Sequence, residues 1–331
     1  HSDGNPQKKQ RVTPRPPTLA DAAQNMQQQK SWFEGVVFLE HVDKKIVREL
    51  MGRNLLRKSA EEWEQEAGRN PEATHLAGWM KFIKRNTAKV RYSLSKVSTW
   101  GRVMPWKSQS LGSLRCAVRG AVCGDGYIDI DAKNCHPTIL VQICRALGIQ
   151  CDALEHYVTN RKDCLDEVQA MYEAGIDETT ADKASKKLFI KVMYGGEPGE
   201  HEDLLADASQ PMPACVTNLA REISSISKEL QARNPAMAKD VRKAFKAKKK
   251  KHNWDGSFLS SYCMEWERRM LESLYRFMCR ESIIDPLKPK CVLCFDGIMV
   301  QHSKIKLPYE ELLQKCTDAV KDDIGLTLTF E

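Results

Sequence analysis

Two short apolar stretches of the chain have the pattern of β-strands and end in an acidic residue. Residues 127–131 are Tyr-Ile-Asp-Ile-Asp, and residues 291–296 are Cys-Val-Leu-Cys-Phe-Asp. Apolar side chains draw such segments into a core, and the carboxylate at the end emerges at the edge of a sheet. The second stretch resumes after Gly297 as Ile-Met-Val, which predicts a β-hairpin with Asp296 at its tip.

Apolar positions elsewhere recur mainly at helical spacing. This spacing predicts a largely helical region over residues 31–97 and further helices over 139–147, 151–194, 216–230 and 258–278. Residues 1–30 are rich in Gln, Pro, Lys and Arg and contain little to bury, so we expect a disordered lead-in there. The Gly- and Pro-rich segment 195–199 interrupts the helical pattern.

Size and composition are those of an ordinary soluble globular protein. The chain has 331 residues, of which 42% are hydrophobic and 29% are charged. This length accommodates one large domain or two to three subdomains around a sizeable core.

The net charge of +7 is mild, but the basic residues are clustered. Residues 241–252 contain seven Lys or Arg and no acid, and such a field attracts polyanions irrespective of sequence. We therefore predict contacts with a nucleic-acid backbone from Lys248, Lys249, Lys250 and Lys251, with a solvated loop as the alternative. Arg115 and Arg119 are four residues apart, on one face if helical, and are further candidates. Residues 81–96 mix basic and aromatic residues, which suits a nucleic-acid contact or an ordinary surface helix.

Twelve cysteines are scattered along the chain, and several lie in apolar runs. No secretory signal and no apolar stretch of membrane-spanning length is present, so we expect free thiols in a reducing intracellular compartment and no membrane partner. Cys291 and Cys294 form a CxxC pair inside a predicted strand. Their side chains would face opposite sides of the sheet, which disfavours a zinc site.

Asp131 and Asp296 are the candidate catalytic residues. Burying a carboxylate without a partner is costly, so acids at strand ends are usually hydrogen-bonded, paired or bound to a cation. Each acid also has a structural alternative, because Asp131 could cap a helix and Asp296-Gly297 is a strong turn signal. Two such acids that converge indicate a site for two Mg²⁺ (or Mn²⁺) ions, which serves phosphoryl or nucleotidyl transfer.

A lysine-rich segment between the two acidic strands supplies the third element. Lys186, Ile190 and Tyr194 follow one another at four-residue spacing and therefore line one side of a helix, with Lys187 next to them. An ammonium group there would neutralise nucleotide phosphates, and the apolar and aromatic side chains would pack on a base. A basic surface helix is the alternative.

In this order and spacing, the three segments resemble the motifs of palm-domain polymerases. The resemblance is strongest to the polymerase family described from transposons and viruses, which is related to family A DNA polymerases and to single-subunit phage-type RNA polymerases. Residues 131–140 resemble motif A, residues 186–195 resemble motif B, and residues 294–300 resemble motif C. The similarity covers roughly residues 100–300, and Glu267 lies in a helix similar to the family's stretch before motif C.

The resemblance implies an α+β fold, a right-hand polymerase core with an antiparallel palm sheet and helical fingers and thumb-like subdomains. It divides the chain into a helical, thumb-like region at 31–110, a palm at 111–150 and 256–331, and a fingers-like helical region at 151–255.

The resemblance also implies roles for individual residues. Asp131 and Asp296 would hold the two Mg²⁺ (or Mn²⁺) ions, Lys186 would contact the triphosphate, and Tyr194 would lie beside the template base. The remaining nucleotide-site residues are Asn134, His136, Lys187 and Ile190. His136 occupies the position where relatives carry a Glu or Tyr that touches the sugar, so the choice of sugar stays open.

Two departures from the family pattern stand out. Gly297 occupies the place of a second carboxylate in family A, and Asp182 and Lys183 stand where an arginine usually precedes the motif B lysine. No segment is long enough for a separate proofreading exonuclease.

The predicted function is therefore that of a nucleotidyltransferase, a template-directed DNA polymerase of transposon or virus type acting in DNA replication. Its partners would be a primer–template nucleic acid and nucleoside triphosphates. The alternatives are an RNA polymerase or primase on the same scaffold, a catalytically degenerate palm that only binds nucleic acid, and a two-metal nuclease.

Overall fold

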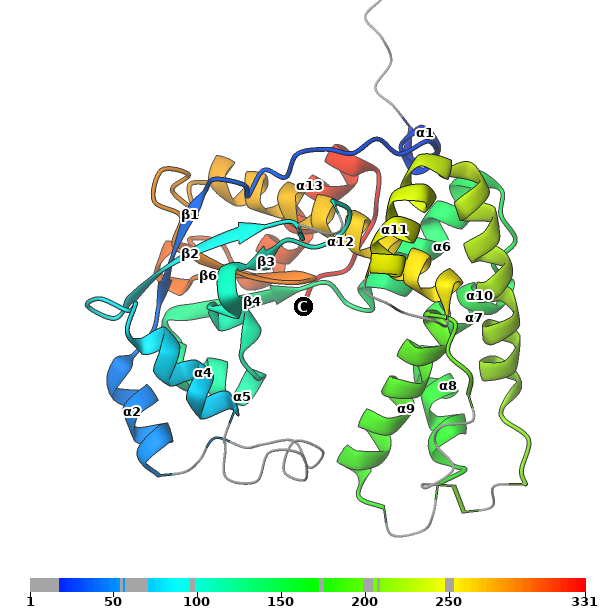
Figure 1. Ribbon diagram of the computed structural model, residues 1–331, viewed down its shortest axis with the longest axis horizontal. Helices are drawn as coiled ribbons and strands as arrows, with labels where there is room; N and C mark the ends of the chain where they lie inside the picture. The colour runs from blue at the N-terminus through cyan, green and yellow to red at the C-terminus, as the bar shows by residue number, and fades with distance from the viewer. Residues whose placement is uncertain are drawn as a thin grey trace, which may run out of the picture.

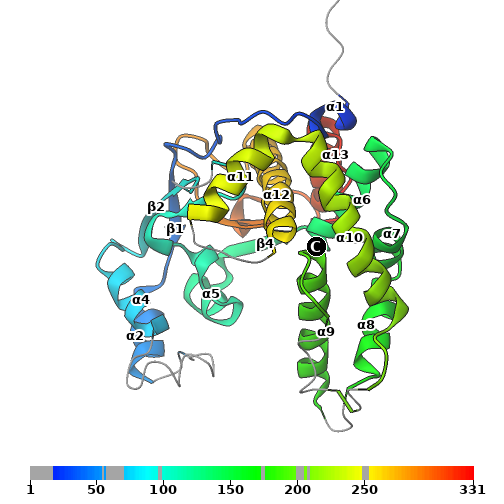
Figure 2. The ribbon, with the colours of Figure 1, turned by 45° about the vertical axis from the view of Figure 1, so that its right-hand side comes forward.

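The computed structural model describes residues 18–53, 56, 71–95, 99–172, 176–198, 205–206, 209–247 and 253–331. The fold is a mixture of helices and small antiparallel sheets (Figure 1). The sheets and helices α2, α4 and α5 form one side of the molecule, helices α8 and α9 extend on the other, and the C-terminal residue lies between them (Figures 1 and 2).

The two acidic segments pair in one antiparallel sheet. Its strands are β4 (Tyr127–Asp131), β6 (Gly297–Gln301) and β5 (Cys291–Cys294), in the order β4-β6-β5. Phe295 and Asp296 form the turn of the expected hairpin, and Phe295 adopts a left-handed backbone with φ of 57°. Asp131 pairs with Gly297, so the ends of the two acidic segments meet.

Gly297 is required where the two acidic segments meet. A Cβ at this position would lie 2.5 Å from Asp131 Oδ1 and 2.7 Å from the Ile130 carbonyl oxygen, closer than any side chain tolerates. The glycine at the position of the second family A carboxylate is therefore the residue that lets the two strands approach.

A second antiparallel sheet contradicts the expectation of a largely helical region over 31–97. It consists of β1 (Val37–His41), β2 (Thr87–Ser93) and β3 (Met104–Pro105) in the order β1-β2-β3. Side chains of β2 alternate between buried and exposed, because Ala88, Val90 and Tyr92 face the core. This period of two was overlooked in a segment whose lysines and arginines resemble a surface helix.

Helices α2 (Lys44–Gly52) and α4 (Pro71–Met80) lie between these strands along the chain. Asp43 begins α2 by accepting hydrogen bonds from the backbone N–H groups of Lys45 and Ile46. The short η1 (Trp106–Ser108) and η2 (Leu111–Ser113), helix α5 (Cys116–Cys123) and η3 (Gly124–Gly126) then lead to β4.

The expectation of a disordered lead-in over 1–30 is wrong for residues 18–30, and residues 1–17 lie outside the described residues. Helix α1 (Leu19–Ala23) begins at Thr18 in a capping box with Asp21. Met26 is buried, and its N–H donates to Asn234 Oδ1 at 3.0 Å. The segment is ordered because it packs on a helix end more than 200 positions away in the sequence.

The helices expected between β4 and residue 230 are present. They are α6 (Cys135–Leu147), then α7 (Asp152–Thr159), α8 (Arg161–Gln169) and α9 (Glu178–Met193) in the region 151–194, and α10 (Ala214–Arg233). Helix α11 (Pro235–Ala247) was not expected, and it contains the first part of the basic run 241–252. Tyr157 of α7 stacks on Phe189 of α9 with ring centroids 4.4 Å apart. This contact fixes α9, which carries the lysine-rich segment.

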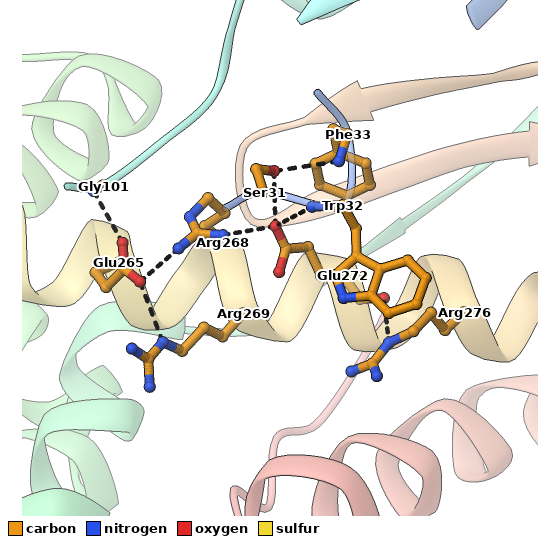
Figure 3. Close-up of polar contacts among 9 residues, drawn as sticks. All are labelled: Ser31, Trp32, Phe33, Gly101, Glu265, Arg268, Arg269, Glu272 and Arg276. Atoms are coloured by element: carbon orange, nitrogen blue, oxygen red, sulfur yellow. Dashed lines mark hydrogen bonds and ion pairs between the residues drawn. The ribbon is translucent and has the colours of Figure 1, made fainter. Parts of the chain in front are cut away.

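The long helix α12 (Trp254–Arg280) lies against both sheets and against α13 (Tyr309–Ile324), which follows β6 and η5 (His302–Lys304). A buried cluster anchors α12 to the rest of the chain (Figure 3). Arg268 donates to Glu265 at 2.5 Å and to Glu272 at 2.6 Å. Glu272 also accepts from Ser31 Oγ, and Glu265 accepts from the Gly101 N–H, so two distant loops are fixed to one helix.

Another buried acid connects the two sheets. Glu40 of β1 accepts hydrogen bonds from Tyr92 Oη at 2.9 Å, Ser110 Oγ at 2.8 Å and the Leu111 N–H at 2.7 Å. The η2 turn that begins there packs tightly on β5, because a Cβ at Gly112 would lie 2.4 Å from the carbonyl oxygen of Leu293. Glu40 thereby supports the hairpin that carries Asp296.

Candidate active-site cleft

A cleft of about 530 Å³ lies where β4, α6, α9, α12 and the β5–β6 turn meet. Its volume is typical of small-molecule sites. Seven of the residues predicted from the sequence line it: Asp131, Asn134, His136, Lys186, Ile190, Tyr194 and Asp296. Residues from distant parts of the sequence therefore converge on one space.

The carboxyl groups of Asp131 and Asp296 lie close enough for the charge of Asp296 to act on Asp131. The backbone fixes this pair, because the Ala132 N–H donates to the Asp296 carbonyl oxygen at 3.1 Å. Burial and the negative charge of Asp296 raise the pKa of Asp131 to about 7 from its ordinary value of 3.8. Burial and the nearby charge of Glu267 raise the pKa of Asp296. Burial and neighbouring carboxylates therefore outweigh the charge of the nearby Arg102, and a bound cation would relieve this imbalance.

The donor set suits Mg²⁺ held together with a phosphate-bearing substrate. Mg²⁺ is usually bound by one or two carboxylates, with water and substrate phosphates completing its shell. Among the described residues, no group of three or more His, Cys, Asp or Glu side chains is placed to hold a metal ion. Cys291 and Cys294 belong to no such group, and both are buried free thiols, as are most of the twelve cysteines.

Four cationic side chains line the cleft, and three of them have an acidic partner. Lys186 pairs with Asp182 at 2.7 Å, and Lys133 pairs with Glu331 at 3.7 Å. The third, Arg102, pairs with Glu267 (below). The fourth, Arg161 at the start of α8, donates to Tyr157 Oη at 3.4 Å and has no ion pair with a described residue. Its charge is available to an anionic ligand.

A chain of hydrogen bonds links α6, α9 and α12 across the cleft. Glu267 accepts two bonds from Arg102, each at 2.5 Å, and lies 2.6 Å from Nε2 of His136. His136 Nδ1 in turn contacts the hydroxyl of Tyr194. Although burial would raise the pKa of Glu267, the hydrogen bonds from His136 and Arg102 lower it overall, so the carboxylate is ionised.

The ionised Glu267 requires a proton on the ring nitrogen of His136 that faces it. Nε2 of His136 must carry a proton to donate to the carboxylate. Burial raises the pKa of Tyr194, so its hydroxyl keeps its proton where it contacts Nδ1 of His136. Tyr194 at the end of α9 is thereby held against α6 and α12.

Arg102 links this chain of hydrogen bonds to the motif C turn. Its guanidinium lies 4.8 Å from the centroid of the Phe295 ring, next to Asp296. Its position is set by Gly101, which has φ of 99° and whose N–H donates to Glu265 of α12 at 3.1 Å. The buried cluster of Figure 3 therefore positions a cleft residue.

Some predicted site residues lie elsewhere. Lys187 is exposed and does not line the cleft, because neighbouring positions on a helix are about 100° apart. Arg115 pairs with Glu72 at 2.6 Å and Arg119 with Asp129 at 3.0 Å, and neither lines the cleft. Lys248, Lys249, Lys250 and Lys251 lie outside the described residues.

Sequence reasoning missed Arg102, Lys133, Arg161 and Glu331 as cleft residues and assigned no role to Glu267. Arg161 has no local motif, and it reaches the cleft only because α8 packs beside α9. Glu331 lies in the cleft because the last residues of the chain pair with the end of β4. The Asp131 N–H donates to the Glu331 carbonyl oxygen at 3.0 Å. The Gly101-Arg102 turn before motif A was a usable signal for Arg102.

Comparisons with known proteins give distant similarities. No family model matches the chain. Over 244 residues the chain is 26% identical to a protein of Sputnik virophage named "Putative helicase V13", an alignment that covers 73% of this chain and 29% of that protein. The chain thus spans less than a third of the length of this relative.

Among solved structures, the chain is similar to the POL domain of Pol1 from M. smegmatis in complex with DNA primer-template and dNTP. The TM-score is 0.42 and the sequence identity is 10%, over 78% of this chain and 49% of that chain. A similarity of this size does not establish a shared fold. Among the described residues, no helix has both the length and the apolar character that crossing a bilayer requires.

Proposed function

We propose that the chain catalyses template-directed nucleotidyl transfer to the 3′ end of a nucleic acid, with deoxynucleotides as the favoured substrates. The observation that carries this proposal is the carboxylate pair of Asp131 and Asp296 in one cleft with Lys186, Ile190 and Tyr194. Paired carboxylates facing a cation on a neighbouring helix are the arrangement that metal-dependent transfer of a nucleotide needs.

Asp131 and Asp296 would hold Mg²⁺ between the reacting groups. Bound Mg²⁺ supplies Lewis-acid chemistry, because it lowers the pKa of a primer 3′-hydroxyl and stabilises the leaving pyrophosphate. Lys186 and Arg161 bind the triphosphate from α9 and α8, which places the α-phosphate at the carboxylate pair. When the triphosphate binds, the ammonium of Lys186 leaves Asp182 and contacts a phosphate, because the ion pair between Lys186 and Asp182 is partly exposed and weak.

The apolar and aromatic side chains of α9 receive the base and the sugar. Ile190 is 59% exposed, so a base that stacks on it removes apolar surface from water. His136 and Tyr194 form the wall on which the sugar rests. Because Glu267 and Arg102 fix His136, this wall is rigid and discriminates between sugars by shape.

The experiment that tests the proposal is primer extension with DNA and RNA templates, each with dNTPs and with NTPs. The proposal expects Mg²⁺-dependent extension, strongest with dNTPs. Extension with NTPs alone would indicate an RNA polymerase or primase. Shortening of the primer would indicate a two-metal nuclease. Binding without extension would indicate a catalytically degenerate palm that only binds nucleic acid.

The name of the virophage relative suggests helicase activity as another function, but the chain does not favour it. No G-x-x-x-x-G-K-[ST] phosphate-binding loop occurs in the sequence. The alignment also leaves most of the relative's length outside this chain. A helicase motor of the usual P-loop type therefore has no candidate residues here.

A further inference from the structure

One face of the sheet β1-β2-β3 packs on α12, and the basic residues of β2 lie on the opposite face. On the covered face, the ring of Phe38 lies 5.8 Å from that of Tyr275 on α12 and 5.2 Å from that of Tyr92. Side chains alternate along each strand, so Lys89 and Arg91 of β2 point away from α12. Both are exposed.

The face turned away from α12 carries no acid. On β1 it presents Val37, Leu39 and His41, on β2 Thr87, Lys89, Arg91 and Ser93, and on β3 Met104. Glu40, the acid of these strands, points to the covered side and is buried. Lys89 and Arg91 form no ion pair with a described residue, so their charges are not neutralised by that part of the protein.

The β1-β2-β3 sheet is joined to the hairpin that carries Asp296. The Leu39 N–H donates to the Pro289 carbonyl oxygen at 2.8 Å, which joins β1 to the segment that leads into β5. In the β4-β6-β5 sheet, Ile130 and Leu293 both pair with Ile298, and Leu293 lies with Leu271 of α12. Asp131 lies at the end of β4 and lines the cleft together with Glu267 of α12, so β1 is joined through β5 to the sheet that carries the cleft.

Exposed apolar side chains connect the cleft with the basic strand. Arg102 lines the cleft, and two residues later Met104 is 43% exposed and pairs with Ser93 of β2. Trp106 follows and is 61% exposed, with Lys107 Nζ 4.4 Å from its ring centroid. Large exposed side chains beside unneutralised cations are typical of nucleic-acid contacts.

We propose that the β2 face, defined by Lys89, Arg91, Met104 and Trp106, binds the sugar–phosphate backbone of the primer–template next to the cleft. Lys89 and Arg91 contact phosphates, and Trp106 and Met104 pack on sugars or bases of the same strand. The identity of the bound nucleic acid as a primer–template rests on the proposed function, whereas the binding itself does not require catalysis.

The test is the salt dependence of binding to a fluorescein-labelled DNA primer–template, measured by anisotropy without divalent metal between 50 and 200 mM salt. The variant Lys89→Gln/Arg91→Gln removes two phosphate contacts, so the slope of log K against log salt should fall by about 2. The control Lys315→Gln/Lys321→Gln makes the same charge change on α13, which packs on α12. It should leave the slope unchanged.

A second variant separates packing from charge. Trp106→Ala should weaken binding several-fold with the salt slope retained, whereas Leu287→Ala, which removes a side chain that is 89% exposed, should have no effect. Equal slopes and affinities for Lys89→Gln/Arg91→Gln and wild type would overturn the proposal. It would also be overturned if these replacements abolished binding to phosphatidylserine vesicles but not to DNA.

The two proposals fail in different ways. If wild type extends no primer but the β2-face variant loses DNA binding, the proposed binding surface is supported and the proposed polymerase function is rejected. Normal DNA binding by that variant, with extension intact, would reject the surface alone.

Discussion

Arg161 differs from the other cations of the cleft because no described carboxylate neutralises it. The family pattern places an arginine one turn before the motif B lysine, and this chain has Asp182 and Lys183 there. Arg161 reaches the same cleft from α8, and under the proposed function it would supply this charge from a different helix. A triphosphate would then be held between α8 and α9.

Replacing Arg161 by Gln should raise the KM for the incoming nucleotide about tenfold or more, with a smaller change in kcat, because a charged hydrogen bond to the substrate is lost. Steady-state primer extension measures both constants. The matched control is Lys162→Gln, the next residue on α8, which is exposed and pairs with Asp166. Equal effects of the two replacements would remove Arg161 from the nucleotide site.

Gly297 tests the geometry of the carboxylate pair at a single residue. In Gly297→Ala the new methyl group would collide with Asp131 and with the Ile130 carbonyl, so we expect a loss of about 1–3 kcal/mol of stability and extension reduced at least a hundredfold. Chemical denaturation and primer extension measure these effects. Gly120→Ala on α5 is the control, because its Cβ would meet nothing within 4 Å and should stabilise the helix slightly. A fully active Gly297→Ala would contradict the close approach of the two strands.

At the scale of elements, buried polar groups determine how strands and helices meet. Glu40 joins β1 to η2, and burial raises its pKa from 4.5 to about 7 despite the hydrogen bonds from Leu111, Ser110 and Tyr92. The folded protein therefore binds this proton more tightly than the unfolded chain. The resulting stability is complete below pH 4.5 and is lost as the pH rises to about 7.

Glu40→Gln keeps an acceptor for these donors but has no charge to bury. Relative to wild type, this variant should gain about 3 kcal/mol of unfolding free energy between pH 4.5 and pH 8. Urea denaturation across this pH range measures the difference. A difference between the two proteins that does not change with pH would show that Glu40 titrates at its ordinary pKa.

The cluster on α12 should respond differently to the loss of its cation. Arg268→Ala leaves Glu265 and Glu272 buried without their shared guanidinium, so we expect a loss of about 3–5 kcal/mol. Arg276 also lies on α12, and it forms a partly exposed ion pair with Asp323 of α13. Arg276→Ala should therefore cost about 1 kcal/mol of stability or less. Similar unfolding free energies for the two variants would show that the buried cluster does not anchor α12.

At the scale of the whole molecule, sequence reasoning succeeded where the signal was local. The hairpin around Asp296 and the face of α9 that carries Lys186, Ile190 and Tyr194 follow from spacing over a few residues. Strand β2 was mistaken for helix because its exposed positions are basic. Its buried residues can be recognised as the inner face of a strand only once β1 and α12, on which they pack, are known.

Other features depended on contacts between distant parts of the chain. Residues 18–30 are ordered by the end of α10, and Arg102 reaches the cleft through Glu265 and Glu267 of α12. The amino-acid composition of a segment does not predict such long-range contacts. The convergence of Asp131 and Asp296 was inferred from motif order, but the chain of hydrogen bonds from Arg102 to Tyr194 required the coordinates.

The most direct measurement of the central claim is Mg²⁺-dependent primer extension by wild type, Asp131→Asn, Asp296→Asn and Asp129→Asn. Asp129 lies on the same strand face as Asp131 but does not line the cleft. The account predicts that either cleft replacement lowers extension by at least a thousandfold with DNA binding retained, that EDTA abolishes wild-type extension, and that Asp129→Asn remains active. Extension by Asp131→Asn or Asp296→Asn at the wild-type rate would contradict it.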